Sequence, residues 1–180
     1  ELAALAAQVN RVISTANSDS LSNAPSLTDL NALGVSGVTT ANLAVVQQAI
    51  ASAATGQVDS LSELQSVVTA ATNAYTAALG TISSYAQSNG GTAPTTSTFA
   101  QAGVSGVDSA NLAAIQSALA STAITGTQVD TTTEVQTLVN AYNRILAEAN
   151  GTAADGTAND PTVADYQTIG VSLGAIAANA

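Results

Sequence analysis

The sequence predicts an all-α protein made of tandem three-helix repeats of about 68 residues that form an elongated array. Apolar residues recur at steps of three and four, which is the spacing of one face of an amphipathic helix. No stretch alternates apolar and polar residues over the length of a strand. A comparison of the chain with itself then reveals an internal repeat, which sets the length of the unit.

Two long segments carry this repeat. The segment "PSLTDLNALGVSGVTTANLAVVQQAIASA" begins at Pro25, and "PTTSTFAQAGVSGVDSANLAAIQSALAST" begins at Pro94, 69 positions later. A third copy, "PTVADYQTIGVS", opens at Pro161, a further 67 positions along. The opening "ELAALAAQVNRVISTAN" matches "EVQTLVNAYNRILAEAN" 133 positions later, which aligns Arg11 with Arg144. The only two basic residues of the chain therefore occupy equivalent positions.

These matches divide the chain into four parts. We expect residues 1–24 to hold the last helix of a preceding repeat, and residues 25–93 and 94–160 to form two complete three-helix repeats. Residues 161–180 then start a further repeat. Because Glu1 lies inside a helical pattern with no signal peptide before it, we interpret the chain as a fragment of a longer protein.

The first helix of each repeat is short. In the first complete copy we expect it at Ser26–Leu33, because Ser26 and Asp29 have the spacing of a capping box. Gly34 follows as a left-handed residue that ends the helix. One apolar slot of this helix recurs in all three copies, as Leu30, Phe99 and Tyr166.

The second helix follows a corner and is expected at about Thr39–Ala54. Thr39 is its expected N-cap, and Val38 is expected to pack on Leu43 as a hydrophobic staple. The next copy keeps this arrangement with Val107, Asp108 and Leu112.

The third helix begins at another capping box, Ser60 with Glu63, which the next copy repeats with Thr131 and Glu134. In the first complete repeat we expect it to continue to about Ser88. The apolar stripe of the second copy is Val135, Leu138, Tyr142, Ile145 and Ala149, and the opening segment repeats it with Leu2, Leu5, Val9, Val12 and Ala16.

The composition excludes several partner classes. The chain has two basic and 12 acidic residues, a formal net charge of −10, and neither nucleic acid nor an anionic membrane attracts such a surface. It has no cysteine, so disulfides and thiolate metal sites are excluded. No apolar run approaches the roughly 18–20 residues that span a bilayer, so membrane insertion is not expected.

The stretch GVSGV occurs twice, at Gly34–Val38 and at Gly103–Val107. A serine between glycines could be a nucleophile on a sharp turn, but the G-x-S-x-G spacing is absent. The chain also has no histidine and no lysine to act as the base. We therefore expect Ser36 and Ser105 to be bystanders in a corner between two helices, and we predict no catalytic residue, no cofactor and no enzyme activity.

One loop offers oxygen ligands for a metal. The junction "NGTAADGTANDP" holds Asn150, Asp155, Asn159 and Asp160, whose side chains suit Ca²⁺. The loop lacks the spacing of an EF-hand, and the other two junctions carry one acidic residue and none. We therefore expect a polar linker with a helix cap at Asp160 and predict no metal site, while calcium binding by the Asp155–Asp160 loop stays open.

Three stretches support a family resemblance. "P-T-x-A-D-Y-x-x-x-G-V" at Pro161–Val171, the GVSGV…ANLA corner, and "E-V-Q-x-L-V-x-A-Y-N-x-I-L-A-E-A-N" at Glu134–Asn150 resemble the helical tandem repeats of very large bacterial surface adhesins and biofilm-associated proteins. They are also similar to three-helix surface modules of the albumin-binding and FIVAR kinds. The third copy departs from the pattern, because it reads GVSLG at Gly170–Gly174.

The resemblance implies a non-enzymatic, extracellular segment of a bacterial cell-surface adhesin. In this interpretation the repeats are a stalk, and their partners are neighbouring repeats of the same chain. Two alternatives stay open. One is a three-helix module that binds a host or matrix protein, and the other is a subunit that assembles head to tail, with residues 1–17 of one molecule on residues 161–180 of the next.

Overall fold

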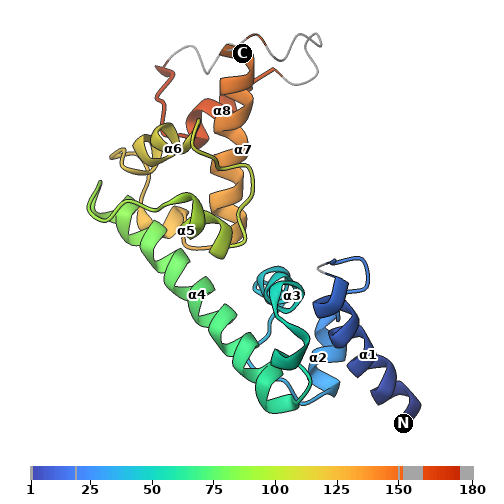
Figure 1. The fold of residues 1–180 in the computed structure, drawn as a ribbon. Coiled ribbons are helices and arrows are strands. Elements are labelled where there is room, and N and C mark those ends of the chain that lie inside the picture. Colours follow the sequence, from blue (N-terminus) through green and yellow to red (C-terminus); the bar gives the residue numbers. More distant parts are fainter. Residues whose placement is uncertain (1, 19, 150, 152–159, 175–180) are drawn as a thin grey trace. The chain divides into compact units, whose positions relative to one another are not determined.

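The computed structural model describes residues 2–18, 20–149, 151 and 160–174, and every regular element in this part of the chain is helical (Figure 1). The predicted all-α class is confirmed. None of the described helices is both long and apolar enough to cross a membrane. The elements in chain order are α1 (Leu2–Ser18), α2 (Leu27–Ala32), α3 (Leu43–Ser52), the 3₁₀ turn η1 (Thr55–Gln57), α4 (Leu61–Gln87), α5 (Thr96–Gln101), α6 (Leu112–Leu119), the 3₁₀ turn η2 (Gly126–Gln128), α7 (Thr132–Ala149) and α8 (Val163–Thr168).

The chain divides into two compact units, Glu1–Thr76 and Ala77–Ala180, which we call unit 1 and unit 2. The division falls inside α4, so this helix gives its first part to unit 1 and its last part to unit 2. The repeat boundaries expected from the sequence, 25–93 and 94–160, follow the recurrence of residues instead. They remain a prediction about the repeating unit.

The core of unit 1 is assembled by α1, α2, α3, the beginning of α4 and the loops between them. Leu30 of α2 and Ile50 of α3 are fully buried in it, and α1 contributes Val12. Burying each of these side chains stabilises the folded chain by about 1.5–3 kcal/mol relative to leaving it exposed. The buried members are Val12, Leu30, Val35, Val46, Ile50, Val58, Leu64 and Val68.

Unit 2 repeats this plan with the last part of α4 in the place of α1. Ile82 of α4 is fully buried, as Val12 is in unit 1. Phe99 of α5 fills the slot that Leu30 fills in unit 1, as the sequence predicts. The other buried members are Ala78, Ala86, Ala102, Val104, Ile115, Leu119, Ile124, Val129, Val135, Leu138 and Val139.

The helix ends confirm most of the predicted signals. Ser26 caps α2, because the Asp29 backbone N–H donates to Ser26 Oγ at 3.1 Å and the Ser26 N–H donates to Asp29 Oδ2 at 2.9 Å. Gly34 follows with a φ of +85°, a left-handed conformation that favours glycine. The capping boxes at the starts of α4 and α7 form as expected, and α4 ends at Gln87, one residue before the predicted end.

The cap expected at Asp160 is wrong. The N-cap of α8 is Thr162, which closes a capping box with Asp165 two positions inside the expected start. The Asp165 backbone N–H donates to Thr162 Oγ1 at 3.3 Å, and the Thr162 N–H donates to Asp165 Oδ2 at 2.7 Å. This reciprocal pair satisfies two backbone donors, which a single cap at Asp160 could not do.

The second helix is shorter than the sequence predicts, because α3 begins at Leu43 and not at Thr39. The Thr39 N–H donates to Asn42 Oδ1 at 2.7 Å, and Asn42 Nδ2 donates to the Gly37 carbonyl at 3.0 Å. These bonds hold residues 39–42 as a separate turn before the helix. Short polar side chains commonly compete with helical hydrogen bonds in this way.

The predicted apolar stripe of α1 is buried only in its C-terminal half. Val12 is 1% exposed, whereas Leu2, Leu5 and Val9 are 83%, 43% and 39% exposed. The apolar stripe that the sequence predicts is therefore present in α1, but unit 1 leaves its N-terminal residues exposed. In α7 the stripe ends differently: Val135 and Leu138 are buried, and Ala149 is exposed.

Candidate functional site

The two GVSGV corners are held by glutamines of the following long helix. The Ser36 N–H donates to Gln65 Oε1 at 2.9 Å, and Gln65 Nε2 donates to the Ser36 carbonyl at 3.2 Å. Ser105 makes the same pair with Gln136, at 2.8 and 3.1 Å. Each glutamine amide thus satisfies both backbone groups of a corner residue that has no helical partner.

The same geometry describes what the serine hydroxyls can do. Ser36 Oγ lies 3.3 Å from Gln65 Oε1, and Ser105 Oγ lies 3.4 Å from Gln136 Oε1. A carboxamide does not take up a proton near neutral pH, so it cannot activate the hydroxyl as a general base. Sequence reasoning missed both glutamines, although their recurrence 71 positions apart was a usable signal.

Other recurring polar side chains also bind the backbone of their own unit. Gln47 Nε2 donates to the Pro25 carbonyl at 2.9 Å, and Gln116 Nε2 donates to the Pro94 carbonyl at 2.8 Å. Asn111 is buried and donates to the Gly106 carbonyl at 2.7 Å, as Asn42 does at Gly37. Each of these bonds gives a backbone carbonyl outside the helices a side-chain donor, which stabilises the loop.

Both arginines pair with the aspartate of a capping box. Arg11 Nη1 lies 3.2 Å from Asp29 Oδ2 at the start of α2. Arg144 donates through Nε at 3.2 Å, and also through Nη2, to Asp165 Oδ1 at the start of α8. Helix α1 is therefore tied to the first turn of α2, and α7 to the first turn of α8, by a charge-assisted bond.

The pair in unit 2 is better shielded from water. The Asp165 side chain is 6% exposed, whereas that of Asp29 is 13% exposed. The hydrogen bond from Arg144, joined by the Thr162 backbone and hydroxyl donors, lowers the pKa of Asp165 to about 2. The pKa of Asp29 is also lowered, first by the Ser26 backbone N–H and then by its hydroxyl, with Arg11 as a smaller cause.

The last part of α4 has no such ion pair. When its buried Ile82 is aligned with Val12 of α1, Thr81 takes the place of Arg11, and Thr98 stands where α2 has Asp29. A different contact holds this helix. Gly126 of η2 donates to Gln87 Oε1 at 3.1 Å, and its carbonyl accepts from Ser83 Oγ at 3.0 Å. A Cβ at Gly126 would lie 2.8 Å from the Ser83 carbonyl oxygen, so this close approach requires glycine.

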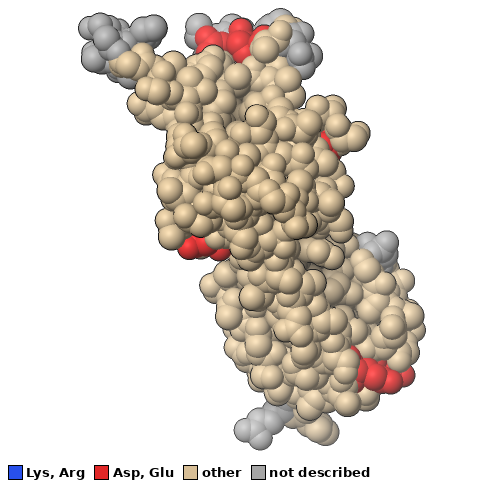
Figure 2. All heavy atoms as spheres, turned by 90° about the vertical axis from the view of Figure 1, so that its left-hand side faces the viewer, with Lys and Arg blue, Asp and Glu red and all other residues tan. Residues whose placement is uncertain are grey.

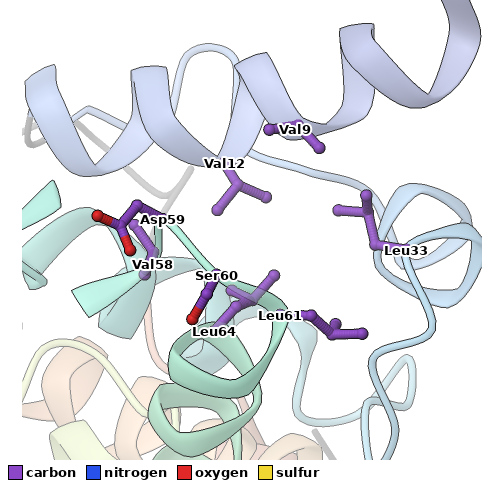
Figure 3. Close-up of a pocket in the computed structure, with 8 residues that line it drawn as sticks. All are labelled: Val9, Val12, Leu33, Val58, Asp59, Ser60, Leu61 and Leu64. Atoms are coloured by element: carbon purple, nitrogen blue, oxygen red, sulfur yellow. The ribbon is translucent and has the colours of Figure 1, made fainter. Parts of the chain in front are cut away.

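A small apolar cavity of about 80 Å³ opens in unit 1 (Figure 3). Ligand pockets usually enclose about 300–1,000 Å³, so this cavity is too small for a cofactor. Leu61 stands at its edge and is 53% exposed. The carboxylates of Asp59 and Glu63 lie close together there, and the contact with Glu63 raises the pKa of Asp59. The lining residues are Val9, Val12, Leu33, Val58, Asp59, Ser60, Leu61 and Leu64.

Acidic side chains do not gather into a metal centre in the described part of the chain. No group of three or more His, Cys, Asp or Glu residues is close enough there to hold an ion. On the face in Figure 2 the acidic side chains form small separated groups on a mostly uncharged surface. Of the loop considered for calcium, Asp160 is exposed, while Asn150, Asp155 and Asn159 lie outside the described residues.

The chain was compared with family models, with curated proteins and with solved structures, and none of the three comparisons found a match.

Proposed function

We propose that this chain is a non-enzymatic structural segment, a run of stalk repeats in an extracellular bacterial adhesin. The observation that supports it is the use of the recurring polar side chains. Gln65 and Gln136, like Gln47 and Gln116, bind backbone groups of their own unit. The polar residues that recur between the copies therefore hold the fold of the repeat itself, as expected of a spacer.

The finer organisation belongs to the same proposal. Each repeat of about 68 residues contains a short helix, a GVSGV corner, a second helix and a long third helix. The long helix also begins the core of the next repeat, as α4 does with Ile82. Sharing a helix between neighbours supports a linear array, because each repeat then depends mainly on the adjacent ones.

The exposed apolar residues favour a spacer over a module that binds a host or matrix protein. A binding face common to the repeats would place the same exposed residue in both units. Leu61 is exposed in unit 1, but its equivalent in unit 2 is Thr132, whose hydroxyl donates to the Ala102 carbonyl at 2.7 Å. Leu21 likewise has Gly90 at the equivalent position.

The location can be tested on intact cells that produce the full-length gene product. An antibody raised against the 180-residue chain should label these cells without permeabilisation. Cells expressing a gene with residues 25–93 deleted are a matched control: they should still be labelled, while the reach of the surface structure becomes shorter. Labelling that appears only after permeabilisation contradicts the proposal.

The array itself can be tested in solution by small-angle X-ray scattering. Repeats that are joined by shared helices should scatter as an elongated particle. Its maximum dimension should increase when a further repeat is added. A compact globule of unchanged maximum dimension would count against a stalk.

A further inference from the structure

The N-terminal half of α1 carries an apolar face whose equivalent in α7 is buried. Leu2 and Leu5 are 83% and 43% exposed, whereas Val135 and Leu138, 133 positions later, are 0% and 2% exposed. Val9 is 39% exposed, and its equivalent Tyr142 packs against the core of unit 2. The same helix half is therefore uncovered in one place and covered in the other.

The segment after the short helix shows the same contrast. Ile169, at the end of α8, packs against the core of unit 2, and its equivalent Leu33 lines the open cavity of unit 1 (Figure 3). A Cβ at Gly170 would lie 2.7 Å from Ser121 Oγ and 3.1 Å from Ala123 Cβ. At the equivalent Gly34, the nearest atom to such a Cβ is Leu61 Cδ2 at 3.9 Å.

We propose that Leu2, Leu5, Val9 and Leu33 form a docking face for one further helical unit built like residues 77–133. The inference rests on the repeat arrangement proposed above and deepens it, because it names the partner of this face. The expected contact is visible in unit 2. There the four equivalent residues lie against the core that residues 77–133 help to build; they are Val135, Leu138, Tyr142 and Ile169.

The chemistry of the face fits this occupant. None of its four side chains is charged, so the partner has to offer an apolar surface, which we call the cradle. In unit 2 the cradle includes Phe99, Ile115, Leu119 and Ile124, all buried. In a second copy of the chain that cradle is already filled by its own α7, and unit 1 is closed by its own α4. A further unit with an unfilled cradle is therefore the complementary partner.

The test uses a chain in which residues 77–133 are fused in front of Glu1. Glu1 then follows Thr133 as Glu134 does, so the capping box with Thr131 and the register of the apolar stripe are both kept. The chain has no cysteine, so Leu5→Cys introduces a single thiol. Its rate of reaction with a thiol reagent should fall by about tenfold or more in the fused chain, because reaction then needs local opening.

Ala7→Cys is the matched control. Ala7 is exposed on the same helix, and its equivalent Asn140 is also exposed in unit 2. Its thiol should react at the same rate in the fused and unfused chains. Equal rates for Leu5→Cys in the two chains, or a fused segment that far-ultraviolet circular dichroism shows to be unfolded, overturn the proposal. Protection of Leu5→Cys in the unfused chain that increases with protein concentration also overturns it, because a second copy is then the occupant.

A second variant tests the energetics of the face. Leu5→Asp should lower the Tm of the unfused chain only slightly, since 43% of the residue is exposed to water there. In the fused chain it should lower the Tm clearly, because a carboxylate is then placed in an apolar contact. An equal effect in both chains overturns the proposal. These measurements do not depend on where the protein is located, so a negative antibody result on cells would leave them unaffected.

Discussion

Helices α1 and α7 carry the same apolar pattern 133 positions apart, yet unit 2 buries the N-terminal half that α1 leaves exposed. In α7 this half packs with Val135 and Leu138 against the core of unit 2, and the other half binds α8 through Arg144. In α1 the second half is buried through Val12 and forms an ion pair through Arg11, while Leu2, Leu5 and Val9 of the first half are 83%, 43% and 39% exposed. The same apolar spacing therefore occurs in a buried and in an exposed half-helix, so the stripe alone does not show which of its residues are covered.

The largest difference should appear when leucine is truncated at the equivalent positions. Leu138→Ala should lower the free energy of unfolding by about 2–5 kcal/mol, because it removes a buried side chain and leaves a cavity. Leu5→Ala should change it by less than about 0.5 kcal/mol, since the leucine is already partly in water. Urea unfolding followed by circular dichroism measures both values. Similar losses for the two variants would mean that the faces of α1 and α7 are equally covered.

The two 3₁₀ turns provide the next comparison. Gly126→Ala in η2 should cost about 1–3 kcal/mol, because the added methyl meets the Ser83 carbonyl oxygen of α4. Gly56→Ala in η1 has open space around it and should stabilise the chain by up to about 1 kcal/mol, by restricting the unfolded state. Thermal unfolding of the two variants in parallel gives the signs. A neutral Gly126→Ala would show that η2 is free to move away from α4.

The two ion pairs should differ less. Arg144→Gln should cost about 1–2 kcal/mol, because it leaves the nearly buried Asp165 carboxylate without its cation. Arg11→Gln should cost less than about 1 kcal/mol, since its single bond to Asp29 is more exposed to water. Unfolding measured at low and high salt separates the two, because salt screens the more exposed Arg11–Asp29 pair more strongly than the Arg144–Asp165 pair. Equal costs would remove the difference that we assign to burial.

The last comparison concerns pH. The pKa of Asp165 is about 2 in the folded protein and 3.8 in its ordinary state, so the unfolded chain takes up the proton first as pH falls. The stability that this carboxylate contributes is therefore fully present above pH 3.8 and is lost as pH falls toward about 2. Hydrogen exchange of the α8 amides between pH 5 and about 2 follows this loss. Asp165→Asn should flatten the profile, and an unchanged profile would contradict the assignment to Asp165.

The elements that the sequence predicted well depend on neighbours a few residues away. The boxes at Ser26–Asp29 and Ser60–Glu63 and the left-handed Gly34 are fixed within one turn, so their spacing alone reveals them. The start of α3 was misplaced, because Asn42 can bind either a turn or a helix end and the sequence does not show which bond wins.

The features that local sequence patterns do not show depend on distant parts of the chain. Gln65 binds a serine that lies 29 residues away, so no local pattern reveals its role. The exposure of Leu5 depends on whether a partner covers α1, although its spacing matches that of the buried Leu138. The recurrence of residues indicates that two positions are equivalent. Only the exposure of the side chains shows that Leu138 is covered by other residues and that Leu5 is not.

The sharing of α4 between two cores has a consequence for the order of folding. Nucleation is the costly step in forming a helix, and extension beyond it adds one hydrogen bond for each residue fixed. Once unit 1 has ordered the beginning of α4, growth of the same helix presents Ile82 to the segment that becomes unit 2. Folding can thus advance from unit 1 to unit 2 through the helix that the two cores share.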